Sequence, residues 1–312
     1  MSVYSFHSSE PVSNQGREYA VSLFHLPEHR TLQSRNGWRS FFVLHEKSRK
    51  LFAEVHFYCE GYSAISPLRA PFGSYVFSEK LPAEVLFDFI LFAEEELMKE
   101  QIRHVMLTLP PAGYFPEQHN MLMPVLLNLK YVVQQARVSS VIPVTEKAFA
   151  EVIDPWENRK LRQARQAALV TRIIPVGNVE KVYTFILECR QEKNYSLSMT
   201  ADEVMAVVEK FPDRFIFFGV FDQDNLAAAA VSIRVTGNVL YNFYSDHHSG
   251  YDHLSPAVML IESEYAYCHD HGLSLLDLGT SSVGDKLNFP LLDFKKRLGG
   301  RPSPKYTFVK DI

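Results

Sequence analysis

The residues whose types most clearly suggest a catalytic role lie near the C-terminus, in the segment DFKKRLGG at positions 293–300. Three consecutive cations, Lys295, Lys296 and Arg297, come directly before two glycines. An ammonium group beside a carbonyl oxygen that becomes negative lowers the barrier to acyl transfer. A solvated basic face of a short helix is the alternative role for these three side chains.

A second candidate group, Asp246, His247 and His248, follows a predicted strand. Imidazole has an ordinary pKa near neutrality, so one of these side chains could bind or deprotonate an amine, and we assign Asp246 and His247 to catalysis. No other metal-binding motif accompanies them, and we expect no metal. Tyr244 and Asp277, each near a strand end, are candidate substrate-binding residues; strand packing and loop capping are the alternatives.

The segment 158–172 contains several basic residues and no acidic residue. Arg159, Arg162 and Arg165 lie on adjacent parts of one side of a predicted helix. Guanidinium groups bind phosphate oxygens in pairs, so we expect these arginines to bind a substrate such as a nucleotide-linked sugar or a nucleic acid strand. An exposed helix that serves solubility is the alternative.

Composition limits the class of protein. The chain has 312 residues, which corresponds to about two domains. The net charge of −4 excludes a protein built around DNA. Three cysteines without a C-x-x-C pair favour a reducing cytoplasm and give no cysteine zinc site. The longest apolar run, Leu226–Val231, is far too short to span a membrane, and the N-terminus is polar, so we expect a cytoplasmic protein without a signal peptide.

The sequence repeats its pattern once. Residues 41–57 and 217–233 each read as an apolar strand, a charged turn and a second apolar strand. In both halves a third strand, an amphipathic helix and a fourth strand follow. The predicted elements are Tyr75–Phe77, Ala83–Glu100 and Val105–Leu109 in the first half, and Val239–Tyr244, Ala257–His271 and Ser274–Leu278 in the second.

The second half carries additional elements. One of its helices is expected to begin at Thr200 with Glu203 at the capping-box position. Together the patterns predict an α/β protein with mixed sheets and two domains, residues 1–145 and 146–312, the second holding the main cleft. The additional elements are helices at Arg159–Val170, Val179–Glu192, Ala201–Lys210 and Pro290–Leu298 and a final strand at Tyr306–Val309.

This order of elements resembles the GNAT acyltransferase fold, and two such units in tandem resemble the FemAB-like branch. Three stretches carry the resemblance: the basic segment 158–169, the helix–glycine–strand segment 255–279 that ends in Asp-x-Gly, and DFKKRLGG. The resemblance implies transfer of an acyl or aminoacyl group to an amine. It also implies that Lys295, four residues before Gly299, stabilises negative charge near the transferred group.

The implied donor is acyl-CoA or aminoacyl-tRNA, and the implied acceptor is a small-molecule amine or one like a peptidoglycan precursor, in cell-envelope or polysaccharide metabolism. The segment 245–256 has one glycine and lacks the glycine loop with which CoA-dependent members bind pyrophosphate. Arg69, beside Pro71, Phe72 and Gly73, stands where the family has a cleft-lining segment; a plain turn is the alternative. A CoA-dependent N-acetyltransferase of a small metabolite, a non-catalytic ligand-binding protein and a tRNA partner all stay open.

Overall fold

The two predicted strand pairs are present, each as an antiparallel hairpin around a charged turn. β2 (Trp38–His45) pairs with β3 (Lys50–Glu60), and β9 (Phe215–Asp222) pairs with β10 (Asn225–Arg234). The central residues of all four strands are buried, as their apolar runs require.

The computed structural model describes residues 3–11, 16–283 and 286–312. They divide into two compact units. The first unit consists of Met1–Val138 with Ser303–Ile312, and the second consists of Ser139–Pro302.

This division differs from the expected boundary at 145 and 146 in two respects. Strand β7 (Val132–Pro143) enters the second unit at Ser139, before the expected boundary. Strand β15 (Arg301–Asp311) returns to the first unit, where it pairs with β6 (His104–Thr108). The C-terminal strand was expected in the second domain, because a local pattern shows that a segment is a strand and not which sheet it joins.

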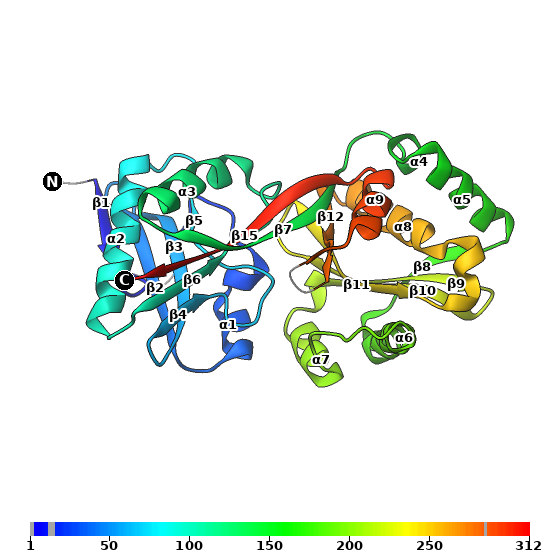
Figure 1. Ribbon diagram of the computed structural model, residues 1–312, viewed down its shortest axis with the longest axis horizontal. Helices are drawn as coiled ribbons and strands as arrows, with labels where there is room; N and C mark the ends of the chain where they lie inside the picture. The colour runs from blue at the N-terminus through cyan, green and yellow to red at the C-terminus, as the bar shows by residue number, and fades with distance from the viewer. Residues whose placement is uncertain (1–2, 12–15, 284–285) are drawn as a thin grey trace. The chain divides into compact units, whose positions relative to one another are not determined.

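The first unit contains a mixed sheet in the order β1-β2-β3-β4-β6-β15-β7, with helix α2 packed against it (Figure 1). β4 and β6 are parallel neighbours, which requires a crossover, and α2 supplies it. The remaining bounds are β1 (Tyr4–His7), η1 (Leu23–His25), α1 (Pro27–Gln33), β4 (Ser63–Ser66), β5 (Val76–Phe77), α2 (Ala83–Lys99) and α3 (Pro116–Asn128).

One predicted strand of this unit has a different place. The pattern predicts the third strand at Tyr75–Phe77, but the strand between β3 and β6 is β4 (Ser63–Ser66). β5 has only two residues and pairs with β3 outside the main strand order. The apolar run at Tyr75 packs into the core of the unit. Periodicity alone does not distinguish such a buried segment from a central strand.

The second unit contains the sheet β7-β12-β11-β10-β9-β8, with α4, α5 and α8 on one face and α6 and α7 on the other (Figure 1). The predicted capping box of Thr200 and Glu203 is formed at the start of α7. The remaining elements of the second unit have the bounds α4 (Phe149–Val152), α5 (Pro155–Gln166), β8 (Val170–Ile174), η2 (Val176–Asn178), α6 (Val179–Glu192), α7 (Ala201–Lys210), η3 (Pro212–Arg214), β11 (Val239–His247), η4 (Ser249–Leu254), α8 (Pro256–Asp270), β12 (Leu275–Thr280), β13 (Ser282–Val283), β14 (Lys286–Leu287) and α9 (Phe289–Arg297).

Helix α8 packs against this sheet with its apolar side. Its residues Val258, Ile261, Tyr265 and Cys268 are buried, and they follow the helical spacing predicted from the sequence. The helix carries the chain from β11 to the parallel strand β12. Among the described residues, none of the helices is both long enough and apolar enough to span a membrane.

Candidate active site

A cavity of about 710 Å³ lies in the second unit where two parallel strands separate. β11 and β12 pair at only three positions, from Val239 opposite Leu275 to Tyr241 opposite Asp277. Beyond them β11 continues to His247 and β12 to Thr280, and both continuing segments line the cavity. Separated strands leave backbone polar groups without ladder partners, which makes the opening a suitable place for a polar ligand.

A β-bulge shapes the β11 wall of the cavity. Val231 of β10 lies opposite Tyr244 and Ser232 lies opposite Asn242, so Phe243 has no partner on β10. A bulge changes the direction of the following side chains. The rings of the adjacent residues Phe243 and Tyr244 consequently stack, with centroids 3.9 Å apart.

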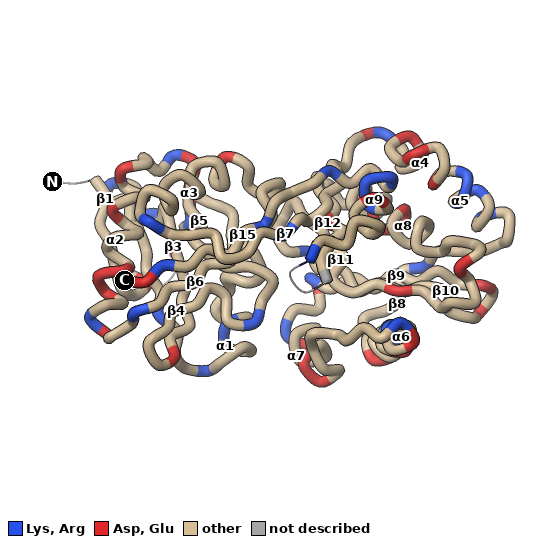
Figure 2. The backbone as a smooth tube through the Cα atoms, viewed as in Figure 1, with Lys and Arg blue, Asp and Glu red and all other residues tan. Residues whose placement is uncertain are grey.

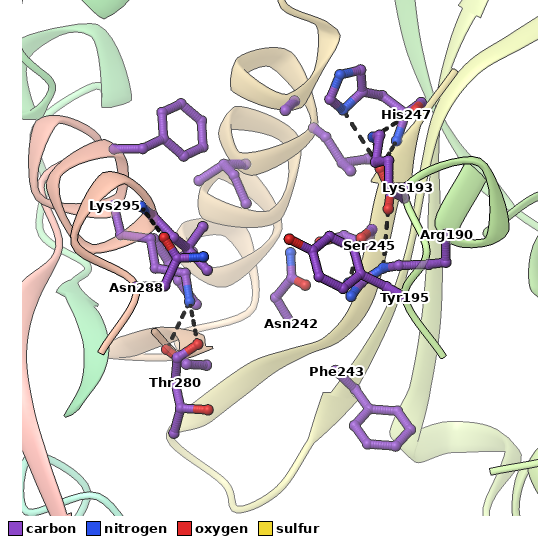
Figure 3. Close-up of a pocket in the computed structure, with 18 of the residues that line it drawn as sticks. Arg190, Lys193, Tyr195, Asn242, Phe243, Ser245, His247, Thr280, Asn288 and Lys295 are labelled. Carbon is purple, nitrogen blue, oxygen red and sulfur yellow. Dashed lines mark hydrogen bonds and ion pairs between the residues drawn. The ribbon is translucent and has the colours of Figure 1, made fainter. Parts of the chain in front are cut away.

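Lys295 of α9 closes the opposite wall (Figure 3). Its Nζ donates to the carbonyl oxygens of Gly279 and Thr280, each at 2.9 Å, at the end of β12. An ammonium group has three N–H donors, and the described residues supply acceptors for only two of them, so one donor remains for a ligand. The side chain is 8% exposed, and burial lowers its pKa to about 8 although the carboxylate of Asp277 acts in the opposite direction.

The two glycines after α9 fix the backbone that carries this lysine. Gly300 donates its N–H to the Lys295 carbonyl oxygen at 2.9 Å, and a Cβ at Gly300 would lie 2.6 Å from the same oxygen. Gly299 has a φ of +86°, a conformation that favours glycine. The two glycines of Leu-Gly-Gly therefore permit the backbone conformation that follows the helix carrying Lys295.

The β11 wall carries a half-buried ion-pair cluster. The Asp246 carboxylate lies 3.0 Å from Nε of Arg190 and 2.5 Å from Nζ of Lys193, both from the C-terminal end of α6. Arg190 and Lys193 also donate to the backbone carbonyl oxygens of Ser245 and His247, respectively. Asp246 is thus paired with two cations.

His247 is the other predicted catalytic residue at this wall. Its Nε2 lies 2.8 Å from Oδ1 of Asp252, and its Nδ1 lies 3.8 Å from Asp246. If Nε2 carries the proton that is donated to Asp252, Nδ1 holds the lone pair of the ring. His247 lines the cavity.

A buried polar group stands behind the middle of the cavity. Asn242 of β11 donates its Nδ2 to Oε2 of Glu264 at 2.9 Å, and Ser232 donates its hydroxyl to the other oxygen of Glu264. Glu264 is fully buried, and burial raises its pKa to about 7, against the opposing effect of these two hydrogen bonds. Figure 3 shows Asn242 between Lys295 and Tyr195 in the view of the cavity.

The predicted site residues fall into three groups, of which two lie at the cavity. Lys295, Asp246 and His247 line the cavity. Tyr244 and Asp277 lie beside it: the Tyr244 hydroxyl accepts from the N–H of Met199, and the Asp277 carboxylate accepts from the N–H of Gly279. Both side chains thus hold backbone segments next to the cavity.

The basic residues of α5 lie outside the residues that line this cavity. They form a basic surface, some of whose positive charges have partners, and Figure 2 shows them as blue positions along α5. The Arg159 guanidinium stacks on the exposed Trp156 ring at 4.1 Å, Arg165 pairs with Glu262, and Arg162 is exposed. Arg69 belongs to the first unit, where it donates to the carbonyl oxygen of Gln33.

Several cavity residues were not predicted from the sequence. Arg190 and Lys193 are three positions apart at the end of a predicted helix, a basic pair that could have been noticed. Asn242 is an isolated polar residue in an apolar strand, and a polar side chain that is buried needs a partner. Glu264 is likewise a polar residue on the buried side of the apolar helix α8, which indicates that it needs a partner. Among the described residues, no group of three or more His, Cys, Asp and Glu could hold a metal ion.

Comparisons with known proteins support the architecture. The chain is similar to the crystal structure of FemX, with 12% sequence identity over 93% of this chain and 92% of that chain and a TM-score of 0.71. It is also similar to L-PGS from Bacillus licheniformis, with 11% identity over 95% and 93% of the two chains and a TM-score of 0.52. A Bacteroides thetaiotaomicron protein of unknown function matches with 10% identity over 86% and 85% and a TM-score of 0.56.

No protein-family model and no curated protein sequence matches the chain. The likeness therefore lies in the fold and not in the sequence. The predicted α/β class with mixed strand pairing is confirmed, and the fold of the chain is similar to that of FemX.

Proposed function

We propose that the chain transfers an acyl or aminoacyl group to an amine in the cavity of the second unit. The observation that carries this proposal is the position of Lys295, whose buried ammonium group lies where β11 and β12 separate and has one donor left for a ligand. A cation in a poorly hydrated site stabilises a developing oxyanion more strongly than it would in water. The FemX-like fold is consistent with this chemistry.

In the proposed reaction the donor carbonyl oxygen accepts the free N–H of Lys295. The neutral amine attacks the carbonyl carbon, a C–N bond forms, and the oxygen becomes negative in the tetrahedral intermediate. Collapse of this intermediate breaks the bond between the carbonyl carbon and the leaving group. The amine nitrogen loses its proton to Nδ1 of His247, and the departing group takes this same proton from His247 as it leaves.

The segment between β11 and α8 argues against CoA as the donor. In this segment and in the strand and helix that flank it, six backbone N–H groups already donate within the chain, so they do not form a cradle for pyrophosphate. They belong to His247, His248, Gly250, Tyr251, Ser255 and Val258. In addition, helix α8 begins with Pro256, which has no N–H.

We therefore infer that the donor is an aminoacyl ester such as aminoacyl-tRNA. The exposed arginines of α5 offer phosphate contacts for such a donor. The proposed acceptor is a primary amine of a small molecule or of a cell-envelope precursor, and the proposed location is the cytoplasm.

Label transfer tests this proposal. The purified chain is incubated with tRNA charged with ¹⁴C-labelled amino acids, or with ¹⁴C-acetyl-CoA, together with a panel of primary amines. We expect a labelled amide from aminoacyl-tRNA and none from acetyl-CoA. Transfer from acetyl-CoA alone would support an N-acetyltransferase, and absence of transfer from either donor would support a non-catalytic ligand-binding protein.

A further inference from the structure

Asn242 occupies an unusual position in the cavity wall. Its side chain is 7% exposed and lines the cavity, and its amide is held from behind by Glu264 of α8. Glu264 is held in turn by Ser232 of β10. Three neighbouring elements thus contribute one polar side chain each to a chain of hydrogen bonds that ends at the cavity.

This chain of hydrogen bonds determines which atom of Asn242 faces away from Glu264. Above about pH 7 Glu264 is ionised, and an ionised carboxylate only accepts hydrogen bonds, so Asn242 must turn its NH₂ group toward Glu264. Its carbonyl oxygen, Oδ1, then points away from the carboxylate. None of the described residues donates a hydrogen bond to this oxygen, which leaves an acceptor at the wall of the cavity.

The carboxylate also affects the strength of this acceptor. Hydrogen bonds in sequence polarise one another, so an amide that donates to a carboxylate carries more negative charge on its oxygen. A ligand group that matches the oxygen must bring an N–H or O–H donor, and a cationic ammonium group matches it best.

We propose that Asn242 is a substrate-binding residue that accepts a hydrogen bond from the primary ammonium or amine group of a substrate, and that Glu264 is the positioning residue that orients it. This inference rests on the function proposed above for the same cavity. The amine has two possible sources, the α-ammonium group of an aminoacyl donor or the amine of the acceptor.

A binding experiment tests the inference without requiring transfer activity. The full-length ¹⁵N-labelled chain is titrated at pH 8 with ethylammonium chloride and, at equal ionic strength, with tetramethylammonium chloride, a cation without an N–H group. We expect ethylammonium to shift the side-chain amide resonances of Asn242 in a saturable manner and tetramethylammonium to leave them unchanged. Equal shifts from both cations, or no shift from ethylammonium, would overturn the proposal.

Variants separate the binding residue from the positioning residue. Asn242→Ala should abolish the saturable response, which is then followed on the backbone amide of Phe243. Glu264→Leu should reduce the initial shift per molar of ethylammonium at least fivefold, because Asn242 loses its fixed orientation. Glu264→Gln can still accept from Asn242 and should stay within twofold of the wild type.

A purely structural role for Glu264 gives a different pattern. In that case the Leu and Gln variants would lower the unfolding temperature and would leave the preference for ethylammonium unchanged in the folded fraction. Such a result would contradict the positioning role even if one variant folded poorly.

The two sources of the amine are distinguished by kinetics if transfer is observed. A rise in KM for the aminoacyl donor in Asn242→Ala assigns the donor's α-ammonium group to Asn242. A rise in KM for the acceptor assigns the acceptor's amine. If transfer is not observed at all, the proposed function fails while the titration still decides whether Asn242 binds an ammonium group.

Discussion

At the scale of single residues, the second unit places unusual groups in a small region. Lys295 is buried with its pKa lowered, and Glu264 is buried with its pKa raised, each because burial disfavours its charged form. Opposite shifts of this kind in and behind the wall of one cavity are typical of sites that perform acid–base or electrostatic chemistry. The pKa of Glu264 has a direct consequence for stability.

Unfolding of the wild type is expected to depend on pH between about 4.5 and 7. Across this range the unfolded chain has released the Glu264 proton while the folded chain still holds it, so stability falls as the pH rises and becomes constant above pH 7. At about 1.4 kcal/mol per pKa unit, the total loss is about 3 kcal/mol.

Glu264→Gln removes this loss because the side chain can no longer ionise. Its free energy of unfolding, measured in urea, should exceed that of the wild type by a difference that grows from pH 4.5 to pH 7. The exposed Glu209→Gln is the matched control and should leave the pH profile unchanged. A difference that is independent of pH would contradict the raised pKa of Glu264.

The sequence predicted the site residues unevenly. Lys295 could be identified because a motif and its spacing to Gly299 mark it in the linear sequence. Asn242 and Glu264 each stand out as a polar residue in an apolar element, but their pairing could not be predicted, since they are 22 positions apart and only the packing of α8 on the sheet brings them together. The α5 arginines were assigned from their charge alone, and charge does not reveal that Glu262 of a neighbouring helix pairs with Arg165.

At the scale of elements, the site depends on the place where β11 and β12 separate and on the end of α9. The sequence predicted α6 and α7 with their observed bounds, because amphipathic spacing and the Thr200 capping box are local signals. It did not predict the bulge at Phe243, which arises from the pairing of β11 with β10. The backbone after α9 is the most restricted part of the site.

Gly300→Ala is expected to disturb this part. The added Cβ would lie 2.6 Å from the Lys295 carbonyl oxygen, a backbone atom that cannot move independently. The free energy of unfolding should fall by about 1–3 kcal/mol, as is typical of overpacking. Gly177→Ala, where no atom lies within 4 Å of the added Cβ, is the control.

Both glycine variants are compared by urea denaturation in a Trp38→Phe background, in which Trp156 reports on the second unit. Equal midpoints for Gly300→Ala and Gly177→Ala would show that the α9 terminus is not restricted as described.

At the scale of the whole molecule, the chain path links the two units through their strands. The sequence predicted two α/β units in tandem from an internal repeat, because both units use the same order of elements. It assigned the last strand to the wrong unit, since β15 pairs with β6, a strand almost two hundred residues earlier. Pairing between distant segments has no signature in local periodicity.

The place of β15 can be tested at Phe308, which is fully buried in the core of the first unit. Phe308→Ala should reduce the stability of that unit by about 3–5 kcal/mol. Trp38 and Trp156, the two tryptophans of the chain, lie in different units and report on them separately.

We therefore expect Phe308→Ala to shift the urea midpoint seen by Trp38 and to leave the midpoint seen by Trp156 nearly unchanged. Tyr62→Ala, at an exposed position of the first unit, should change neither midpoint. A shift confined to Trp156 would agree with a domain boundary at 145 and 146 and would contradict the observed units.

The most direct test of the account is the rate of label transfer from aminoacyl-tRNA by Lys295→Met, compared with the wild type and with the exposed neighbour Lys296→Met. Thermal unfolding confirms that each variant is folded. The account predicts that Lys295→Met loses at least about 100-fold in rate, as expected when a donor to an oxyanion is removed, while Lys296→Met keeps the wild-type rate. A folded Lys295→Met variant that transfers within threefold of the wild-type rate would contradict it.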